Sequence, residues 1–204
     1  MDALIQEKIE KSFDYAHYRT MVAQLLSEGK TTGPNQSEDY IFYTQLNQQR
    51  MDRLDKRLKL SPAWKPLLEN LSRRYTFLTI TEAWCGDAAQ NLPIIDAIAQ
   101  QSDKITHHLV LRDEHLELMD RYLTGGARSI PKTIFFDADT GEELGTWGPR
   151  PAEAQKMVMA YKALPEPKPP YTEFVKGVQL WYAKNRTVST QEELLTLLRE
   201  FEKV

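Results

Sequence analysis

The spacing of apolar residues changes along the chain from a helical to an extended pattern near residue 75. Before that point apolar side chains recur every three or four residues, as in Ile5, Ile9 and Phe13, which is the period of one helix face. Between Tyr75 and Thr81 the residues are instead apolar and β-prone in an unbroken run, as in a buried strand. The pattern therefore predicts a helical segment followed by a sheet-forming segment.

Glycine, proline and capping residues divide this pattern into elements. Helices are expected over residues 1–30, 37–58, 61–72, 86–100, 113–123, 151–163, 172–184 and 190–203. Strands are expected over 75–81, 104–111, 131–136 and 142–147, with a hairpin turn at 137–141. Thr190 and Glu193 are expected to form a capping box for the last helix. The order from 75 to 163 is β-α-β-α-β-β-α, and the fold class is α/β.

Three parts of the chain follow from these elements. Residues 1–72 form a helical N-terminal extension, and residues 73–163 form the α/β domain. Residues 164–204 comprise a proline-rich connector, which should be stiff, and C-terminal helices that pack on the domain.

Composition excludes several classes of function. A net charge of -3 makes no case for binding nucleic acid or an anionic membrane surface. The N-terminus lacks the apolar core of a signal peptide, and no apolar run approaches the length of a membrane span. One cysteine excludes an internal disulfide and disfavours a structural zinc site. We expect a cytoplasmic protein with a reduced thiol and with neither a metal nor a cofactor.

That single cysteine, Cys85, lies where the strand 75–81 passes into the helix 86–100, in the sequence Trp84-Cys85-Gly86-Asp87. At a helix N-terminus the unpaired N–H groups and the helix dipole favour a negative charge. Asp87 complements the same dipole but opposes a thiolate two residues away. We therefore expect a solvent-reachable thiol with a pKa modestly below the free value of about 8.5. The alternative is a small, buried apolar residue.

Other residues near this junction allow two interpretations each. Glu82 is either a surface loop charge or a proton-transfer group for the thiol. The charged segment 47–53 is either a solvated helix face or brings Arg50 or Arg53 toward the thiol. The histidines that could in principle ligate a metal, but that we expect to be exposed or hydrogen-bonded instead, are His107, His108 and His115.

The element order, with Trp84-Cys85-Gly86 at the first β-α junction, resembles thioredoxin. Pro93 stands eight residues after Cys85, where thioredoxins carry a proline that kinks the active-site helix. The segment 125–131, which ends in Ile130-Pro131, resembles the thioredoxin segment whose cis proline faces the catalytic cysteine. The resemblance covers roughly residues 70–163 and implies a thioredoxin-like fold, with a mixed four-stranded sheet flanked by additional helices.

The resemblance also implies roles for residues. Cys85 would be the catalytic nucleophile, and the substrate would contact Trp84, Gly86, Asp87, Ile130 and Pro131. In thioredoxins the backbone before the cis proline pairs with the extended chain of a bound disulfide substrate. With its helical extensions and the segment 47–51, the chain looks like a bacterial subgroup with one active-site cysteine.

Two departures from thioredoxin bear on mechanism. Ala88 occupies the position of the second cysteine, and Thr79 occupies that of a buried acid that assists it. A dithiol reductase attacks with the first thiolate and resolves the mixed disulfide with the second. This chain cannot release a substrate by that route.

The sequence therefore predicts a monothiol thioredoxin-like protein. Cys85 would exchange with protein or low-molecular-weight disulfides, and an external thiol would resolve the mixed disulfide. The alternative is a non-catalytic thioredoxin-fold interaction module, since both the resolving cysteine and the buried acid are missing. A peroxidase is disfavoured, because Glu82 stands where the usual threonine precedes the reactive cysteine by three residues.

Overall fold

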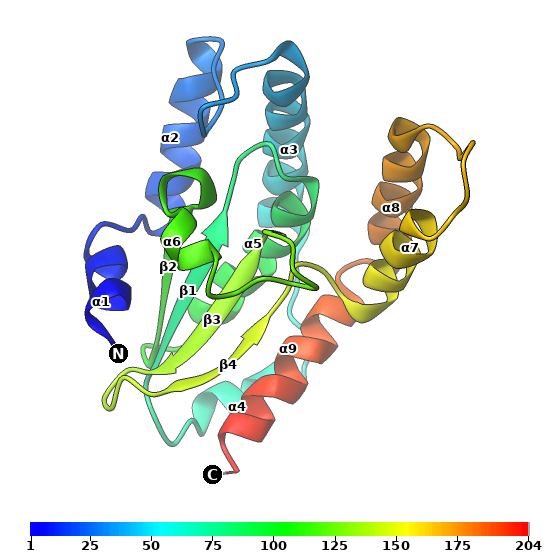
Figure 1. Ribbon diagram of the computed structural model, residues 1–204. Coiled ribbons are helices and arrows are strands. Elements are labelled where there is room, and N and C mark those ends of the chain that lie inside the picture. Colours follow the sequence, from blue (N-terminus) through cyan, green and yellow to red (C-terminus); the bar gives the residue numbers. More distant parts are fainter. Residues whose placement is uncertain (204) are drawn as a thin grey trace.

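A mixed four-stranded sheet forms the centre of the computed structural model, which describes residues 1–203 (Figure 1). The strands are β1 (Tyr75–Thr81), β2 (Ile105–Leu111), β3 (Lys132–Asp137) and β4 (Glu143–Trp147), in the spatial order β2-β1-β3-β4. β1 and β2 are parallel, whereas β3 is antiparallel to both β1 and β4. This is the α/β class and the mixed four-stranded sheet that the sequence predicted.

The helices surround this sheet. Their bounds are α1 (Ala3–Glu10), α2 (Tyr15–Ser27), α3 (Glu38–Arg57), α4 (Trp64–Glu69), α5 (Gly86–Ala99), α6 (Leu116–Met119), α7 (Ala152–Lys162), α8 (Tyr171–Asn185) and α9 (Val188–Phe201). A 3-10 turn, η1 (Arg112–Glu114), precedes α6. Within the described residues no helix combines the length and apolar character needed to cross a bilayer.

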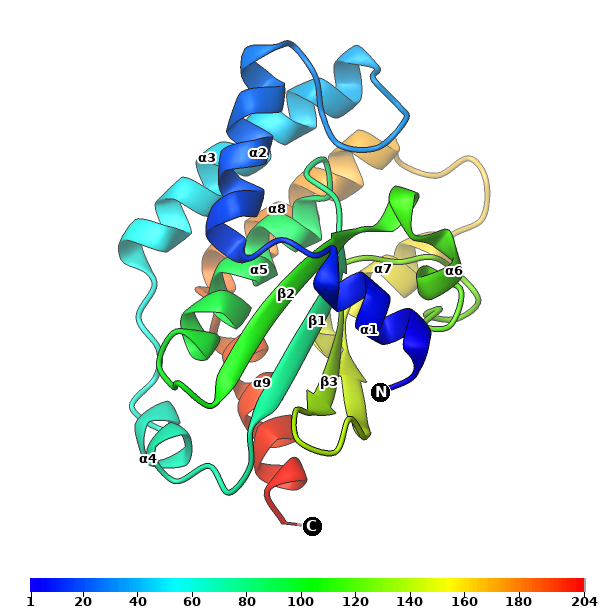
Figure 2. The same ribbon diagram turned by 90° about the vertical axis from the view of Figure 1, so that its left-hand side faces the viewer.

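The alternation of side chains along β1 creates two cores, one on each face of the sheet. All seven residues of β1 are buried, as expected for a central strand covered on both faces. Leu78 and Ile80 join a cluster that includes residues of α1 and α6. Phe77 joins the opposite cluster, which contains residues of α4, α5 and α9. Figure 2 shows α1 in front of the sheet and α9 behind it.

Four expected elements differ from the structure. The helix expected over 1–30 is two helices, because the backbone N–H and C=O of Phe13 both bond to Leu109 of β2, and the chain is extended there. The helix expected over 113–123 shortens to η1 and α6, and the third helix begins at Trp64 rather than at Ser61. The spacing of apolar residues is a local signal and does not reveal a long-range backbone bridge. It therefore could not predict the break of the first helix at Phe13.

The fourth difference concerns the expected capping box of α9. Its N-cap is Thr187, whose side chain makes no capping bond, and the N–H of Ser189 in the first turn donates to Asn185 Oδ1 at 3.0 Å. The Thr190 hydroxyl donates instead to Asn91 Oδ1 of α5 at 2.8 Å. Glu193 accepts from Trp147 Nε1 at 2.8 Å and from the N–H of Ala152 at 2.7 Å. Both polar side chains therefore tie α9 to the rest of the fold. The division at residues 72 and 163 stays a prediction.

Gly148 follows β4 and has a φ of +113°. A Cβ at this position would overlap the backbone carbonyl oxygen of Pro131. We expect Gly148→Ala to lower the free energy of unfolding by at least about 2 kcal/mol, through the unfavourable φ and the clash. Chemical denaturation measures this change.

Gly177→Ala is the matched control, because Gly177 lies inside α8, where an added Cβ would meet no neighbouring atom within 4 Å. Alanine should raise the free energy of unfolding by about 0.5–1 kcal/mol, because glycine loses more conformational freedom in a helix. Equal destabilisation by both substitutions would contradict the steric argument for Gly148.

Candidate thiol site at the start of helix α5

Cys85 is the N-cap of α5, as the strand-to-helix pattern predicted. Its Sγ accepts the backbone N–H of Ala88 at 3.4 Å. The thiol donates to the backbone carbonyl of Ile130 at 3.3 Å. The Ile130–Pro131 peptide bond is cis, and Pro93 lies inside α5. The structure therefore brings together Cys85 and the Ile130-Pro131 pair, which are 45 residues apart in sequence.

The expected exposure and acidity of the thiol are wrong. Cys85 is only 9% exposed. Burial raises the pKa of the thiol to about 12, the negative charge of Asp87 adds to the rise, and the N–H of Ala88 and the charge of Arg150 oppose it. The helix N-terminus is present as predicted, but loss of hydration outweighs it. The thiol is protonated at neutral pH.

Asp87 connects three segments around the thiol. Its Oδ2 accepts from Arg150 Nε at 2.9 Å and Nη2 at 2.7 Å, and its Oδ1 accepts from the Tyr182 hydroxyl at 2.7 Å. The side chains of Asp87 and Arg150 are 14% and 13% exposed. Tyr182 also accepts from Asn91 Nδ2 at 3.1 Å. Arg150 and Tyr182 were not identified from the sequence, since nothing local marks them as partners of a residue some 60 and 95 positions away.

Gly86 permits a close approach of α8 and α3 to the first turn of α5. A Cβ at Gly86 would lie 3.0 Å from Gln179 Nε2 of α8 and 3.6 Å from Arg50 Nη1 of α3. Arg50 donates to Asn47 Oδ1 at 2.6 Å, and Asn47 Nδ2 donates to the carbonyl of Ala83 at 2.8 Å. Of the two arginines that the sequence allowed near the thiol, Arg50 is thus the one beside this turn.

Trp84 packs between a tyrosine and an arginine. Its ring centroid lies 4.8 Å from that of Tyr40, and the guanidinium of Arg112 lies 4.7 Å from the ring, within the range of a cation–π contact. Trp84 is half-buried, whereas Ile130 and Pro131 are buried. The site is closed in this structure, and the substrate-contact roles of Trp84, Gly86, Asp87, Ile130 and Pro131 stay predictions.

Glu82 is fully buried, so the expectation of a surface loop charge is wrong. Its carboxylate accepts from the hydroxyl of Thr32 and, at 2.9 Å, from the N–H of Asp113. The same Thr32 hydroxyl accepts the N–H of Ala83 at 2.9 Å. Burial raises the pKa of Glu82 to about 7, and the bonds from Thr32 and Asp113 lower it less. Through these hydrogen bonds, Glu82 links the end of β1 to the loop before α3 and to η1.

Two of the three candidate histidines are held by hydrogen bonds, whereas His115 is half-buried and its Nδ1 has no hydrogen-bond partner among the described residues. His107 Nε2 lies 3.0 Å from the Thr79 hydroxyl, and His107 Nδ1 lies 3.2 Å from an Asp96 carboxylate oxygen. His108 Nδ1 lies 2.8 Å from the Ser12 hydroxyl. Across residues 1–203 no three His, Cys, Asp or Glu side chains gather as a metal site would require.

A sequence profile for thioredoxin matches residues 33–163, which is more than half of the chain. The chain belongs to the thioredoxin family. Among solved structures, a protein of unknown function from Pseudomonas aeruginosa is 17% identical, with 92% of this chain and 98% of that chain covered and a TM-score of 0.56. An HIV epitope scaffold is 16% identical, with coverage of 92% and 99% and a TM-score of 0.52.

These two structures show a shared fold alone, which extends over the flanking helices as well as the thioredoxin domain. No curated protein matches the sequence. The thioredoxin match begins at residue 33, inside the segment that the sequence assigned to a separate N-terminal extension.

The position of thioredoxin's second cysteine is closed as well as chemically inert. Ala88 is 1% exposed, and its N–H bonds to Cys85 Sγ. Thr79, at the position of thioredoxin's buried acid, has its hydroxyl 2.9 Å from that of Thr133 and is fully buried. The Thr79 hydroxyl is therefore engaged within the sheet, with Thr133 and with His107 Nε2 at 3.0 Å.

Asp87→Asn should make the thiol more acidic. The substitution removes the negative charge that raises the pKa of Cys85 and leaves the charge of Arg150, which lowers it. We expect the thiol pKa to fall by about one pH unit or more. Iodoacetamide alkylation at pH 8 should then be about threefold faster or more, since the lower nucleophilicity of a more acidic thiolate offsets part of the gain.

The pH dependence of the alkylation rate measures this pKa. Asp103→Asn is the control, because Asp103 is an exposed loop carboxylate and its loss should leave the profile unchanged. An unchanged or higher thiol pKa in Asp87→Asn would contradict the electrostatic role assigned to Asp87.

Glu82 should make the protein less stable as pH rises from about 4.5 to about 7. Its folded-state pKa of about 7 lies above the ordinary value of 4.5, so the folded state binds the proton more tightly than the unfolded state does. The resulting penalty is absent below about pH 4.5 and complete above about pH 7. Each pH unit of that elevation corresponds to about 1.4 kcal/mol.

Urea denaturation between pH 5 and pH 8 tests this dependence, with Glu82→Gln as the comparison. Subtracting the pH profile of the free energy of unfolding of Glu82→Gln from that of the wild type removes the contributions of the histidines. The free energy of unfolding of the wild type, relative to that of the variant, should fall as pH rises. Parallel profiles would show that Glu82 ionises normally.

Proposed function

We propose that this thioredoxin-family protein carries out thiol–disulfide exchange through Cys85, with an external thiol as the resolving group. The observation that supports it is the placement of Cys85 Sγ at the first turn of α5, 3.3 Å from the carbonyl of Ile130 and beside Pro131. We further propose that it belongs to a bacterial, cytoplasmic subgroup of the family with a single active-site cysteine.

The proposed reaction has two displacements. The Cys85 thiolate attacks one sulfur of a protein or low-molecular-weight disulfide, and the other sulfur leaves as a thiolate. The new bond is a mixed disulfide between Cys85 and the partner. An external thiolate then attacks that disulfide, takes over the partner's sulfur and returns Cys85 as a thiolate. Ala88 supplies no sulfur for an internal second step.

Because the site is closed, we expect the thiol of the unbound protein to react slowly with disulfides. With a pKa of about 12, only about 1 in 10⁵ molecules carries the thiolate at pH 7. The higher intrinsic nucleophilicity of a basic thiolate compensates in part, which leaves the rate roughly 100-fold below that of a free cysteine. Efficient exchange therefore requires that the partner alter the surroundings of Cys85.

A bound partner can do so through Ile130. The carbonyl that accepts the Cys85 thiol is part of the backbone that would pair with an extended substrate chain. A substrate N–H that donates to this carbonyl would displace the thiol from it. The neutral thiol would lose its acceptor, which favours ionisation. The carbonyl oxygen of Ile130 would then both bind the substrate backbone and control the ionisation of the Cys85 thiol.

The burial of Cys85 favours a second candidate function, a non-catalytic interaction module. Cys85 is 9% exposed and protonated. Such a cysteine can serve only as a small apolar residue in the core, without reacting. In this case the fold and its flanking helices would hold a partner without using the sulfur.

Insulin reduction in the presence of a supplied small thiol distinguishes the two functions. We expect wild-type protein to accelerate the reaction and Cys85→Ser to leave it at the uncatalysed rate. Mass spectrometry should detect the mixed disulfide on Cys85 before the small thiol is added. Circular dichroism confirms that the serine variant is folded. Equal rates for the two proteins, with no adduct, would reject exchange and favour the interaction module.

A further inference from the structure

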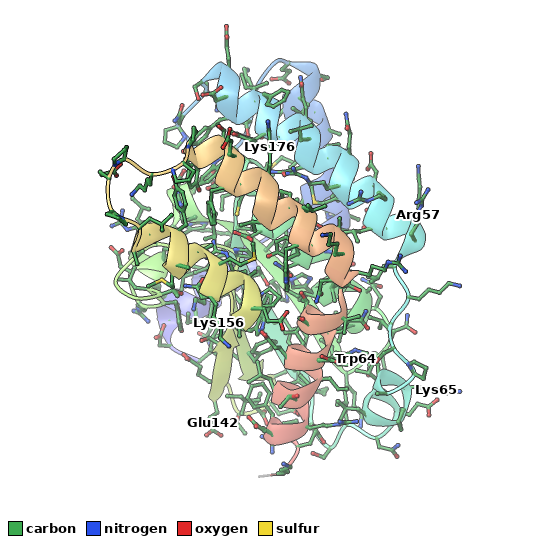
Figure 3. The ribbon with its side chains drawn as sticks, turned by 90° about the vertical axis from the view of Figure 1, so that its right-hand side faces the viewer. Arg57, Trp64, Lys65, Glu142, Lys156 and Lys176 are labelled. Carbon is green, nitrogen blue, oxygen red and sulfur yellow. The ribbon has the colours of Figure 1, made fainter. Side chains whose placement is uncertain are left out.

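A pocket of about 560 Å³ lies between the C-terminal half of α3, the middle of α5 and the turn from α8 into α9. Figure 3 shows α3 and α8 ending on the same side of the molecule, with Arg57 at the end of α3. Small-molecule sites usually measure about 300–1,000 Å³, so the pocket is large enough for such a ligand. Cys85 does not line it.

Four cationic residues line this pocket, and no Asp or Glu of the described residues does. They are Arg53, Arg57, Lys59 and Arg186. None of the four forms an ion pair with a carboxylate of residues 1–203. In a chain whose net charge is -3, this gathering is a local excess of positive charge, and a concave wall concentrates its field.

The acidic residues of the same helix face elsewhere. Asp52 and Asp55, which alternate with the arginines along α3, both pair with Arg19 of α2. The two faces of α3 therefore separate charge: carboxylates toward α2, and cations toward the pocket. Four like charges repel one another, and a bound anion would relieve that repulsion.

The rest of the wall is apolar or uncharged. Leu54 and Leu58 of α3 and Ile94 of α5 contribute aliphatic surface. Tyr182 contributes to the pocket and donates its hydroxyl to Asp87. A bare inorganic anion would leave this apolar surface unused, whereas a ligand with an apolar body would cover it.

We propose that this pocket binds a small organic anion in which a phosphate monoester is joined to an apolar or aromatic body. Guanidinium groups match phosphate oxygens with paired N–H donors, and several cations suit a group with more than one negative charge. The volume of the pocket suits a small ligand, and a net charge of -3 makes no case for a nucleic acid strand. The proposal is independent of the exchange reaction.

Isothermal titration calorimetry with phenyl phosphate tests the proposal, with inorganic phosphate and phenol as the two parts of the probe. We expect phenyl phosphate to bind at least tenfold more tightly than either part. The double variant Arg57→Gln/Arg186→Gln should weaken binding at least tenfold. Both residues are exposed, so the fold should be retained, and the thermal midpoint verifies this.

The matched control is Lys156→Gln/Lys176→Gln, which removes the same charge from exposed positions outside the pocket (Figure 3). This control and Cys85→Ser should bind phenyl phosphate as the wild type does. Equal loss of affinity in the arginine and lysine variants would overturn the site and indicate general charge attraction. Equal affinity for inorganic phosphate and phenyl phosphate would overturn the organic ligand.

Discussion

The need to pair one nearly buried carboxylate organises the surroundings of the thiol. Asp87 lies in the first turn of α5 with 14% of its side chain exposed, and an unpaired charge at such a position would be costly. Its partners come from outside the local sequence: Arg150, before α7, and Tyr182, in α8. Satisfying Asp87 therefore fixes the C-terminal helices against the thiol helix.

Burial determines the protonation state of Cys85, and the charge of Asp87 adds to its effect. A helix N-terminus is worth about 0.3–1 kcal/mol to a negative charge, which is less than one pH unit of pKa. Burial and the charge of Asp87 act in the opposite direction and raise the thiol pKa to about 12. The preference of the helix start for a negative charge is thus outweighed by the burial of the thiol and by the charge of Asp87.

The sequence predicted well what depends on neighbouring residues. The bounds of β1 and the presence of Pro93 within α5 agree with the structure, because period and turn residues are local signals. The contact of Cys85 with Ile130 followed from the family resemblance. The break at Phe13 and the pairing of Asp87 with Arg150 did not follow, since each depends on which distant segment comes to lie beside it. Thr190 and Glu193 show the same limit. Their spacing satisfies the capping-box pattern, yet Thr190 donates to Asn91 of α5 and Glu193 accepts from Trp147 of β4, because α9 lies where these two side chains need hydrogen-bond partners.

The buried polar residues of the sheet bond to one another rather than to the thiol. Thr79 bonds to Thr133 and lies beside His107, which in turn lies beside Asp96. These groups satisfy one another within the fold, and none offers the sulfur a proton acceptor. With Ala88 in place of a second thiol, the resolving sulfur would have to arrive with a partner. Exchange at Cys85 would then be controlled by which partner can reach Ile130, rather than by the acidity of the resting thiol.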